Sequence, residues 1–126
     1  MSGLRIRVEN VGEGIALMFP DGDIDSHSCF ALKQALDKAH RTEPKSIIID
    51  MGNVSQISNA GLDIVLGAMK AMEERQAELI LCNLRSSTRT MFERVREMPS
   101  NRLFSDMDSA RREAEVLLGQ NKQVQI

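Results

Sequence analysis

Aromatic residues are almost absent from this chain of 126 residues, which has four Phe, no Tyr and no Trp. Nucleic-acid sites that depend on stacking against aromatic rings are therefore not expected. There is no excess of positive charge either, because 16 basic residues face 18 acidic ones and the net charge is −2. Without a basic stripe, the composition does not favour binding to nucleic-acid phosphates.

Cysteine, histidine and long apolar runs are scarce as well. The two cysteines, Cys29 and Cys82, cannot form the disulfide framework of a secreted mini-protein or a four-cysteine zinc site. His27 and His40 are more than three helical turns apart, so local spacing does not place them in one site. Apolar runs such as 47–49 are far too short to cross a bilayer. We therefore expect a cytoplasmic protein with no membrane insertion, no cofactor and no catalytic centre.

The acidic turn at 21–25 opens like a calcium-binding loop, with carboxylates at alternate positions. The pattern then fails, because such a loop needs Gly at its sixth position and Glu at its twelfth, where this chain has Ser26 and Leu32. We interpret the segment as a solvated turn in which Asp25 or Ser26 caps the following helix. No metal site is predicted.

Short apolar strands alternate with amphipathic helical segments along the rest of the chain. The first two strands have apolar residues at every second position, and the glycines between them predict a hairpin. Later apolar positions recur at helical spacing between further strands. Strands are expected near 4–9, 15–19, 46–50, 79–82 and 103–104, and helices near 26–40, 58–72, 91–95 and 106–118.

This order predicts an α/β fold, because strands that alternate with helices are joined by parallel crossover connections. We expect a single domain over residues 1–119. It should contain a mixed, mostly parallel sheet of about five strands, with about four helices packed mainly on one side. One helical layer is expected to be enough, because the first two strands show polar faces. Residues 120–126 are expected to form a polar C-terminal tail.

One segment, 50–62, is the best candidate for a functional site. A buried strand ends at Asp50, a polar loop follows, and small residues from Ser58 open a helix at the edge of the sheet. Free N–H groups and the positive end of the helix dipole suit such a position to an anion or a phosphorylated hydroxyl. Its small side chains also leave the backbone open to a partner. The alternative is a polar helix cap with no further role.

Several stretches, in this order, resemble the STAS domain family, as found in bacterial anti-sigma factor antagonists. They are the turn 22–25, the strand 47–51 with Val54 and Ile57 behind it, the helix start 58–62, and the strand 79–84 followed by Met91 and Phe92. The likeness covers roughly residues 4–118, and the order and spacing carry it more than any single motif. It implies a small sheet covered by helices and a non-enzymatic role in partner switching and transcription regulation.

The resemblance also implies a partner and a switch. An antagonist of this family binds an anti-sigma factor, or a serine kinase of the histidine-kinase-like ATPase type, until the serine at the start of its second helix is phosphorylated. That position falls on Asn59, and the Asp before it falls on Ser58. Because Asn59 has no hydroxyl, the resemblance implies a constitutive binder or a switch controlled through the partner. Whether Ser58 is a phosphoacceptor or an ordinary N-cap stays open.

The expected partner-binding surface combines the turn before the first helix with the start of the second helix and its exposed flank near Lys70. Its residues are Gly22, Asp23, Asp25, Ser26, Ser58, Asn59, Ala60, Gly61, Leu62 and Asp63. The same resemblance leaves open a second role, that of an adaptor subunit on the ATPase of a lipid-transport complex, where no phosphorylation switch is needed. A homodimer, through the first strand or a helix face, also stays open.

Overall fold

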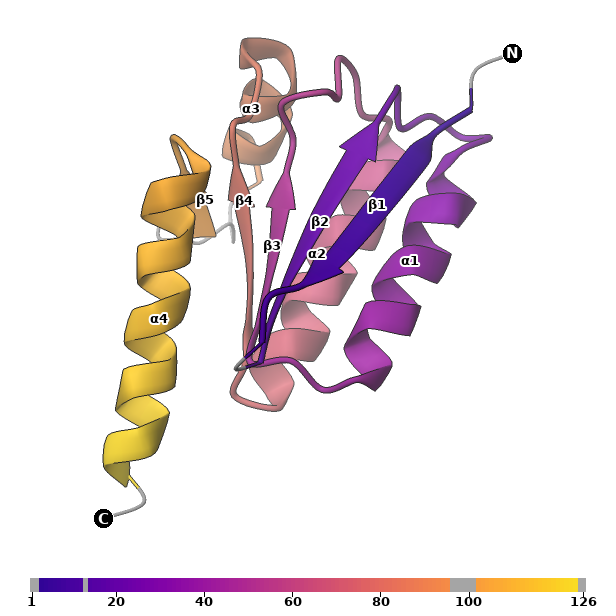
Figure 1. Cartoon of the computed structure of the whole chain (residues 1–126). Coiled ribbons are helices and arrows are strands. Elements are labelled where there is room, and N and C mark those ends of the chain that lie inside the picture. The colour runs from indigo at the N-terminus through magenta and orange to yellow at the C-terminus, as the bar shows by residue number, and fades with distance from the viewer. Residues whose placement is uncertain (1–2, 13, 96–101, 125–126) are drawn as a thin grey trace.

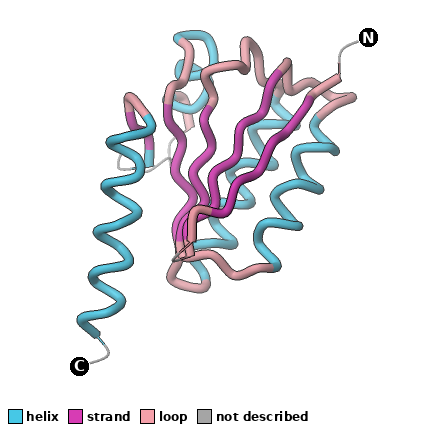
Figure 2. Tube along the Cα trace, viewed as in Figure 1, coloured by secondary structure: helices cyan, strands magenta, loops and turns pink. Residues whose placement is uncertain are grey.

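The computed structural model describes residues 3–12, 14–95 and 102–124, and its strands and helices alternate as predicted (Figures 1 and 2). The strands are β1 (Arg5–Asn10), β2 (Ile15–Asp21), β3 (Ser46–Asp50), β4 (Glu78–Cys82) and β5 (Leu103–Phe104), and the helices are α1 (Cys29–Arg41), α2 (Asn59–Glu74), α3 (Ser86–Glu93) and α4 (Met107–Val124).

The strands form one five-stranded sheet in the order β1-β2-β3-β4-β5. β1 pairs antiparallel with β2 through the hairpin, and the other neighbours are parallel. The mixed, mostly parallel α/β sheet is therefore confirmed. Because β2, β3 and β4 run in the same direction, the loops that follow them leave the sheet at one end, which we call the carboxyl edge.

The larger part of the core lies between the sheet and the helices α1 and α2. Leu32 and Leu36 of α1 and Val65 and Met69 of α2 point into it, as expected from their helical spacing. This core is aliphatic apart from Phe92 of α3. The central strands contribute Ala16, Met18, Ile47, Ile49, Leu79 and Leu81.

The helix α4 packs on the opposite face of the sheet, apart from α1 and α2 in Figure 1. Its Ala110 and Ala114 contact the alternate residues of the same strands, such as Ile48 and Ile80. The prediction that the helices lie mainly on one side is confirmed. The prediction that one helical layer would be enough, made from the polar faces of the first two strands, is wrong, because α4 covers the second face. The strands β3, β4 and β5, which α4 contacts, are apolar on this face as well, and β2 is likewise apolar on both faces from Ile15 to Phe19.

A buried ion pair lies on the α4 face, at the end of the sheet opposite to the carboxyl edge. Glu78 is nearly inaccessible at 3% exposure, and its Oε1 lies 3.2 Å from Nη1 of Arg102. Burial raises the pKa of Glu78 to about 7; Arg102 lowers it, and the carboxylate of Glu113 on α4 raises it further. A carboxyl in this position is therefore partly protonated near neutral pH.

The last helix is longer than the sequence indicated. The backbone of α4 stays helical to Val124, well into the segment expected to be a polar tail. Among the described helices, none has the length and apolar character needed to span a bilayer.

Candidate partner-binding site

Two loops that are far apart in the sequence run side by side at the carboxyl edge. Gly22 N–H donates to the carbonyl of Asn53 at 3.0 Å, and Ile24 N–H donates to that of Gln56 at 2.9 Å. In return, Ser58 N–H donates to the carbonyl of Ile24 at 2.7 Å. These bonds continue the parallel pairing of β2 and β3 into the loops. They bring together the two segments that the sequence proposed as one surface.

The first turn of α2 fits against this double loop because it contains a glycine. A Cβ atom at Gly61 would lie only 2.5 Å from Cγ2 of Ile24 and 3.0 Å from Cγ1 of Ile57. Gly61 and Leu62 are both buried. These two residues of the predicted surface therefore support it from beneath and are not part of its exposed face.

The helix α2 begins at Asn59, with Ser58 as its N-cap. The Oγ of Ser58 accepts a hydrogen bond from Gly61 N–H at 3.1 Å, which satisfies one of the free donors of the first turn. The Ser58 hydroxyl is half-buried, whereas Asn59 and Ala60 are exposed. The uncharged start of α2 is thus open to solvent, and no other described segment covers it.

The turn before α1 is held by Asp25. Its Oδ1 accepts hydrogen bonds from the backbone N–H of Ser28 at 2.8 Å and of His27 at 2.9 Å. These two donors, Ser28 first, hold the pKa of the Asp25 carboxyl below its usual value. Ser26 does not cap α1, as one prediction had it, because the helix begins only at Cys29 and Ser28 is its N-cap residue.

A third element, α3, borders the start of α2, which the sequence did not indicate. Between α3 and α2 lies a hollow of about 640 Å³, whose apolar floor opens beside Asn59. Amphipathic spacing had indicated an apolar side of α3 but not what it packs against. The hollow is lined by Ile57, Ser58, Asn59, Leu62, Met91, Arg94 and Val95.

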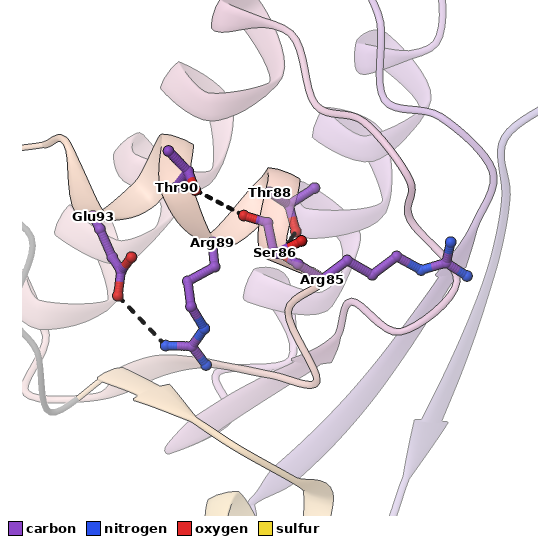
Figure 3. Close-up of polar contacts among 6 residues, drawn as sticks. All are labelled: Arg85, Ser86, Thr88, Arg89, Thr90 and Glu93. Atoms are coloured by element: carbon purple, nitrogen blue, oxygen red, sulfur yellow. Dashed lines mark hydrogen bonds and ion pairs between the residues drawn. The ribbon is translucent and has the colours of Figure 1, made fainter.

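Arg85, just before α3, ties this helix to the loop after β3. Its Nε donates to the carbonyl of Gly52 at 2.9 Å, and the hydroxyl of Ser87 donates to the carbonyl of Ser55 at 2.8 Å. Figure 3 shows the Arg85 side chain directed away from Arg89, which pairs with Glu93 on the same helix. Of these two arginines, Arg85 thus holds a loop and Arg89 lines a solvated face of the helix.

Reactive chemistry finds little support among the described residues. Burial, followed by the charges of Asp50 and Asp106, raises the pKa of the Cys82 thiol to about 12, so it is not a nucleophile at neutral pH. No three His, Cys, Asp or Glu side chains of the described ranges come together as metal ligands. What the carboxyl edge does present is an exposed set of small and acidic side chains. We call this set, Asp23, Ser26, Asn59, Ala60 and Asp63, the carboxyl-edge surface.

Comparison with known families supports the resemblance seen in the sequence. A family model described as the STAS domain matches residues 8–110. The chain belongs to the STAS domain family. The match runs from β1 into α4, so it includes every residue of the carboxyl-edge surface.

Relatives of known type agree with this assignment. The anti-sigma-B factor antagonist of Listeria monocytogenes is 33% identical over 76 residues, which cover 60% of this chain and 67% of that protein. An anti-sigma factor antagonist from Mycobacterium paratuberculosis has a similar structure, with a TM-score of 0.75 at 21% identity over 90% of this chain and 95% of the other. The structure of unphosphorylated SpoIIAA is also similar, with a TM-score of 0.68 at 19% identity over 89% of this chain and 97% of the other. The structures share the fold, and the sequence relative supports a regulatory STAS module.

Proposed function

We propose that this chain is a non-catalytic regulatory module that binds an anti-sigma factor, or a serine kinase of the histidine-kinase-like ATPase type, through the carboxyl-edge surface. The observation that carries the proposal is the pairing of the two loops, which sets Asp23 and Ser26 beside the exposed start of α2. The hollow between α2 and α3 adds apolar area next to it. A rigid, exposed surface with adjoining apolar area is suited to a protein partner. The named relatives do not favour the adaptor role in lipid transport.

Regulation should differ from that of a phosphorylated antagonist. The position expected for the phosphoacceptor holds Asn59, which has no hydroxyl, and the neighbouring Ser58 hydroxyl already accepts the capping bond from Gly61. We therefore propose constitutive binding, or control exercised through the partner. Incubation with a cognate kinase and ATP should leave Asn59 unmodified, and intact-mass measurement should show at most one added phosphate. One stoichiometric phosphate on Ser58 would instead mean that a shifted switch operates.

The binding surface can be tested with Asn59→Asp, which should leave the fold intact. A carboxylate in the first turn of a helix is favoured by the helix dipole, so α2 should keep its stability. At a buried contact, however, the added charge loses its hydration, and affinity should fall about tenfold or more. Isothermal titration calorimetry against a purified anti-sigma factor or kinase measures this change. An unchanged affinity would place the interface elsewhere.

Affinity capture with matched variants identifies the partner class. Ala60→Lys adds a long charged side chain to the carboxyl-edge surface, whereas Glu115→Lys adds a lysine to an exposed position on α4. A histidine-kinase-like ATPase captured by the wild type and by Glu115→Lys, but lost with Ala60→Lys, supports the proposal. Retention of the same ATPase by Ala60→Lys contradicts the proposed surface.

A further inference from the structure

The strand β1 forms one edge of the sheet, and no described segment pairs with its outer side. Its register with β2 shows which backbone groups are free. Val11 N–H donates to the carbonyl of Ile15 at 3.1 Å. Every second residue before Val11, that is Glu9, Arg7 and Arg5, therefore directs its N–H and C=O toward β2. The N–H and C=O groups of the residues between them, Ile6, Val8 and Asn10, point outward and can pair with another strand.

One of these outward positions carries an exposed apolar side chain. Val8 is 41% exposed, and it lies over a cavity of about 500 Å³ between β1 and α1. The side chains of α1 that line this cavity include the small residues Ala35 and Ala39. They leave room beneath the edge of the sheet. A strand added to β1 would lie over the cavity and cover Val8.

The other face of β1 carries charges of both signs. Nη1 of Arg7 lies 3.2 Å from Oε2 of Glu9, and the Arg7 guanidinium carbon lies 4.3 Å from the centre of the Phe19 ring. Charged side chains on an edge strand normally discourage pairing with another sheet. A strand that carries both signs can nevertheless pair with a copy of itself, provided that the register places opposite charges together.

Only one symmetric register of β1 does this without placing like charges opposite each other. If a two-fold axis is centred on Val8, Arg7 lies opposite Glu9 of the partner subunit on both sides of the axis. Centring the axis on Arg7 or on Glu9 opposes two like charges, and centring it on Ile6 sets Arg5 opposite the partner's Arg7. An axis on Asn10 gives no pair of opposite charges within β1. The register centred on Val8 also matches the outward backbone groups, because Val8 exchanges hydrogen bonds with the partner's Val8.

We propose that two copies of this chain pair through β1, antiparallel and centred on Val8, so that their sheets join into one. Two Arg7–Glu9 pairs lie where side chains approach most closely, at about 4.5–5.5 Å between Cβ atoms. The two Val8 side chains cover each other over the merged cavities. The carboxyl-edge surface lies on the loops after β2 and β3 and on α2, so each copy keeps its own. This dimer does not depend on the proposed function.

Charge reversal in the full chain tests the register by sedimentation equilibrium. Glu9→Arg brings only positive side chains together at these positions, and Arg7→Glu brings only negative ones. Each variant should dissociate with a constant at least about tenfold above that of the wild type. An equal mixture of the two should form a heterodimer, because each Arg7–Glu9 position again joins opposite charges. Glu74→Arg, an exposed charge reversal at the end of α2, is the matched control and should dimerise like the wild type.

A second variant avoids the contact of Arg7 with Phe19. Val8 N–H does not bond to β2, so Val8→Pro keeps the hairpin while it removes the central outward donor, and the chain should become monomeric. The proposal is overturned if the wild type stays monomeric up to millimolar concentration. It is also overturned if either charge-reversed variant dimerises like the wild type, or if the mixture forms no heterodimer.

Discussion

The two faces of the sheet are stabilised by different means, and the candidate site depends on only one of them. On the α1–α2 face, the core continues past the strands into the loops of the carboxyl edge, where Ile24, Val54 and Ile57 are buried in the same cluster as Leu32. On the α4 face, the helix contributes small alanines, and a buried ion pair lies near its middle turns. The site should therefore keep its shape as long as the packing on the α1–α2 face is intact. Loosening of α4 should not disturb it.

The largest expected effect on stability comes from a cavity in the core of the α1–α2 face. Leu32 is fully buried, so Leu32→Ala should lower the free energy of unfolding by about 2–5 kcal/mol through lost transfer energy and a cavity. Urea denaturation measures this change. Leu118→Ala on the partly buried side of α4 is the matched change on the other face, and its cost should be nearer to about 1 kcal/mol. Equal costs for the two variants would contradict the difference between the faces.

The stability contributed by the α4 face should depend on pH through Glu78. Because its pKa is raised from 4.5 to about 7 in the folded chain, the folded state binds more protons than the unfolded state between these values. The stability contributed by Glu78 should therefore be fully present below about pH 4.5, fall as pH rises, and be lower by roughly 3 kcal/mol at pH 7. Glu78→Gln should remove this slope, as shown by urea titrations at several pH values. An identical slope in both proteins would exclude Glu78 as the cause.

The contact between loop and helix should depend on one glycine of α2 and not on another. Gly61→Ala places a methyl group against Ile24 and should cost about 1–3 kcal/mol through overpacking. Gly67, in the middle of the same helix, has open space where a Cβ would lie. Gly67→Ala should therefore stabilise the chain by about 0.5–1 kcal/mol through helix propensity. Thermal unfolding of both variants would reveal opposite signs, and two destabilising changes would contradict this view.

The smallest effect concerns the cap of α2. Ser58→Ala removes the hydrogen bond to Gly61 N–H and should cost about 1 kcal/mol. Amide hydrogen exchange should increase mainly in the first turn of α2, while α4 keeps its protection. Equal increases in both helices would mean that the two faces unfold together.

Much of the fold could be predicted from local patterns. The strand at 46–50 and the short strand at 103–104 were placed correctly, because an unbroken apolar run between turn residues has few alternatives. The end of α4 was not placed correctly, because the apolar positions stop at Leu118 and Gly119 follows as at a helix end, yet the helix continues to Val124. The cap of α1 was assigned to Asp25 or Ser26, whereas the N-cap residue is Ser28, because Asp25 and Ser28 first form a turn of their own.

The candidate site was predicted in part. Small, uncharged residues at the start of α2 and the acidic turn were both recognised as one surface through the family resemblance. The contribution of Met91 and Arg94 was missed, since nothing in the sequence of α3 indicates which neighbour its apolar side will contact. The pair of Glu78 and Arg102 was missed for the same reason, because its partners are separated by an entire helix.

The sequence by itself determined the order of strands and helices, the aliphatic character of the core, and the absence of a hydroxyl at position 59. Each of these follows from residue type or from spacing within a few turns, which local sterics and burial translate directly into structure. Only the tertiary structure decided that Gly61 and Leu62 are buried, that α4 crosses to the second face, and that the edge of β1 is open. These depend on contacts between residues distant in the chain, whose free energies appear only when the whole sheet is assembled.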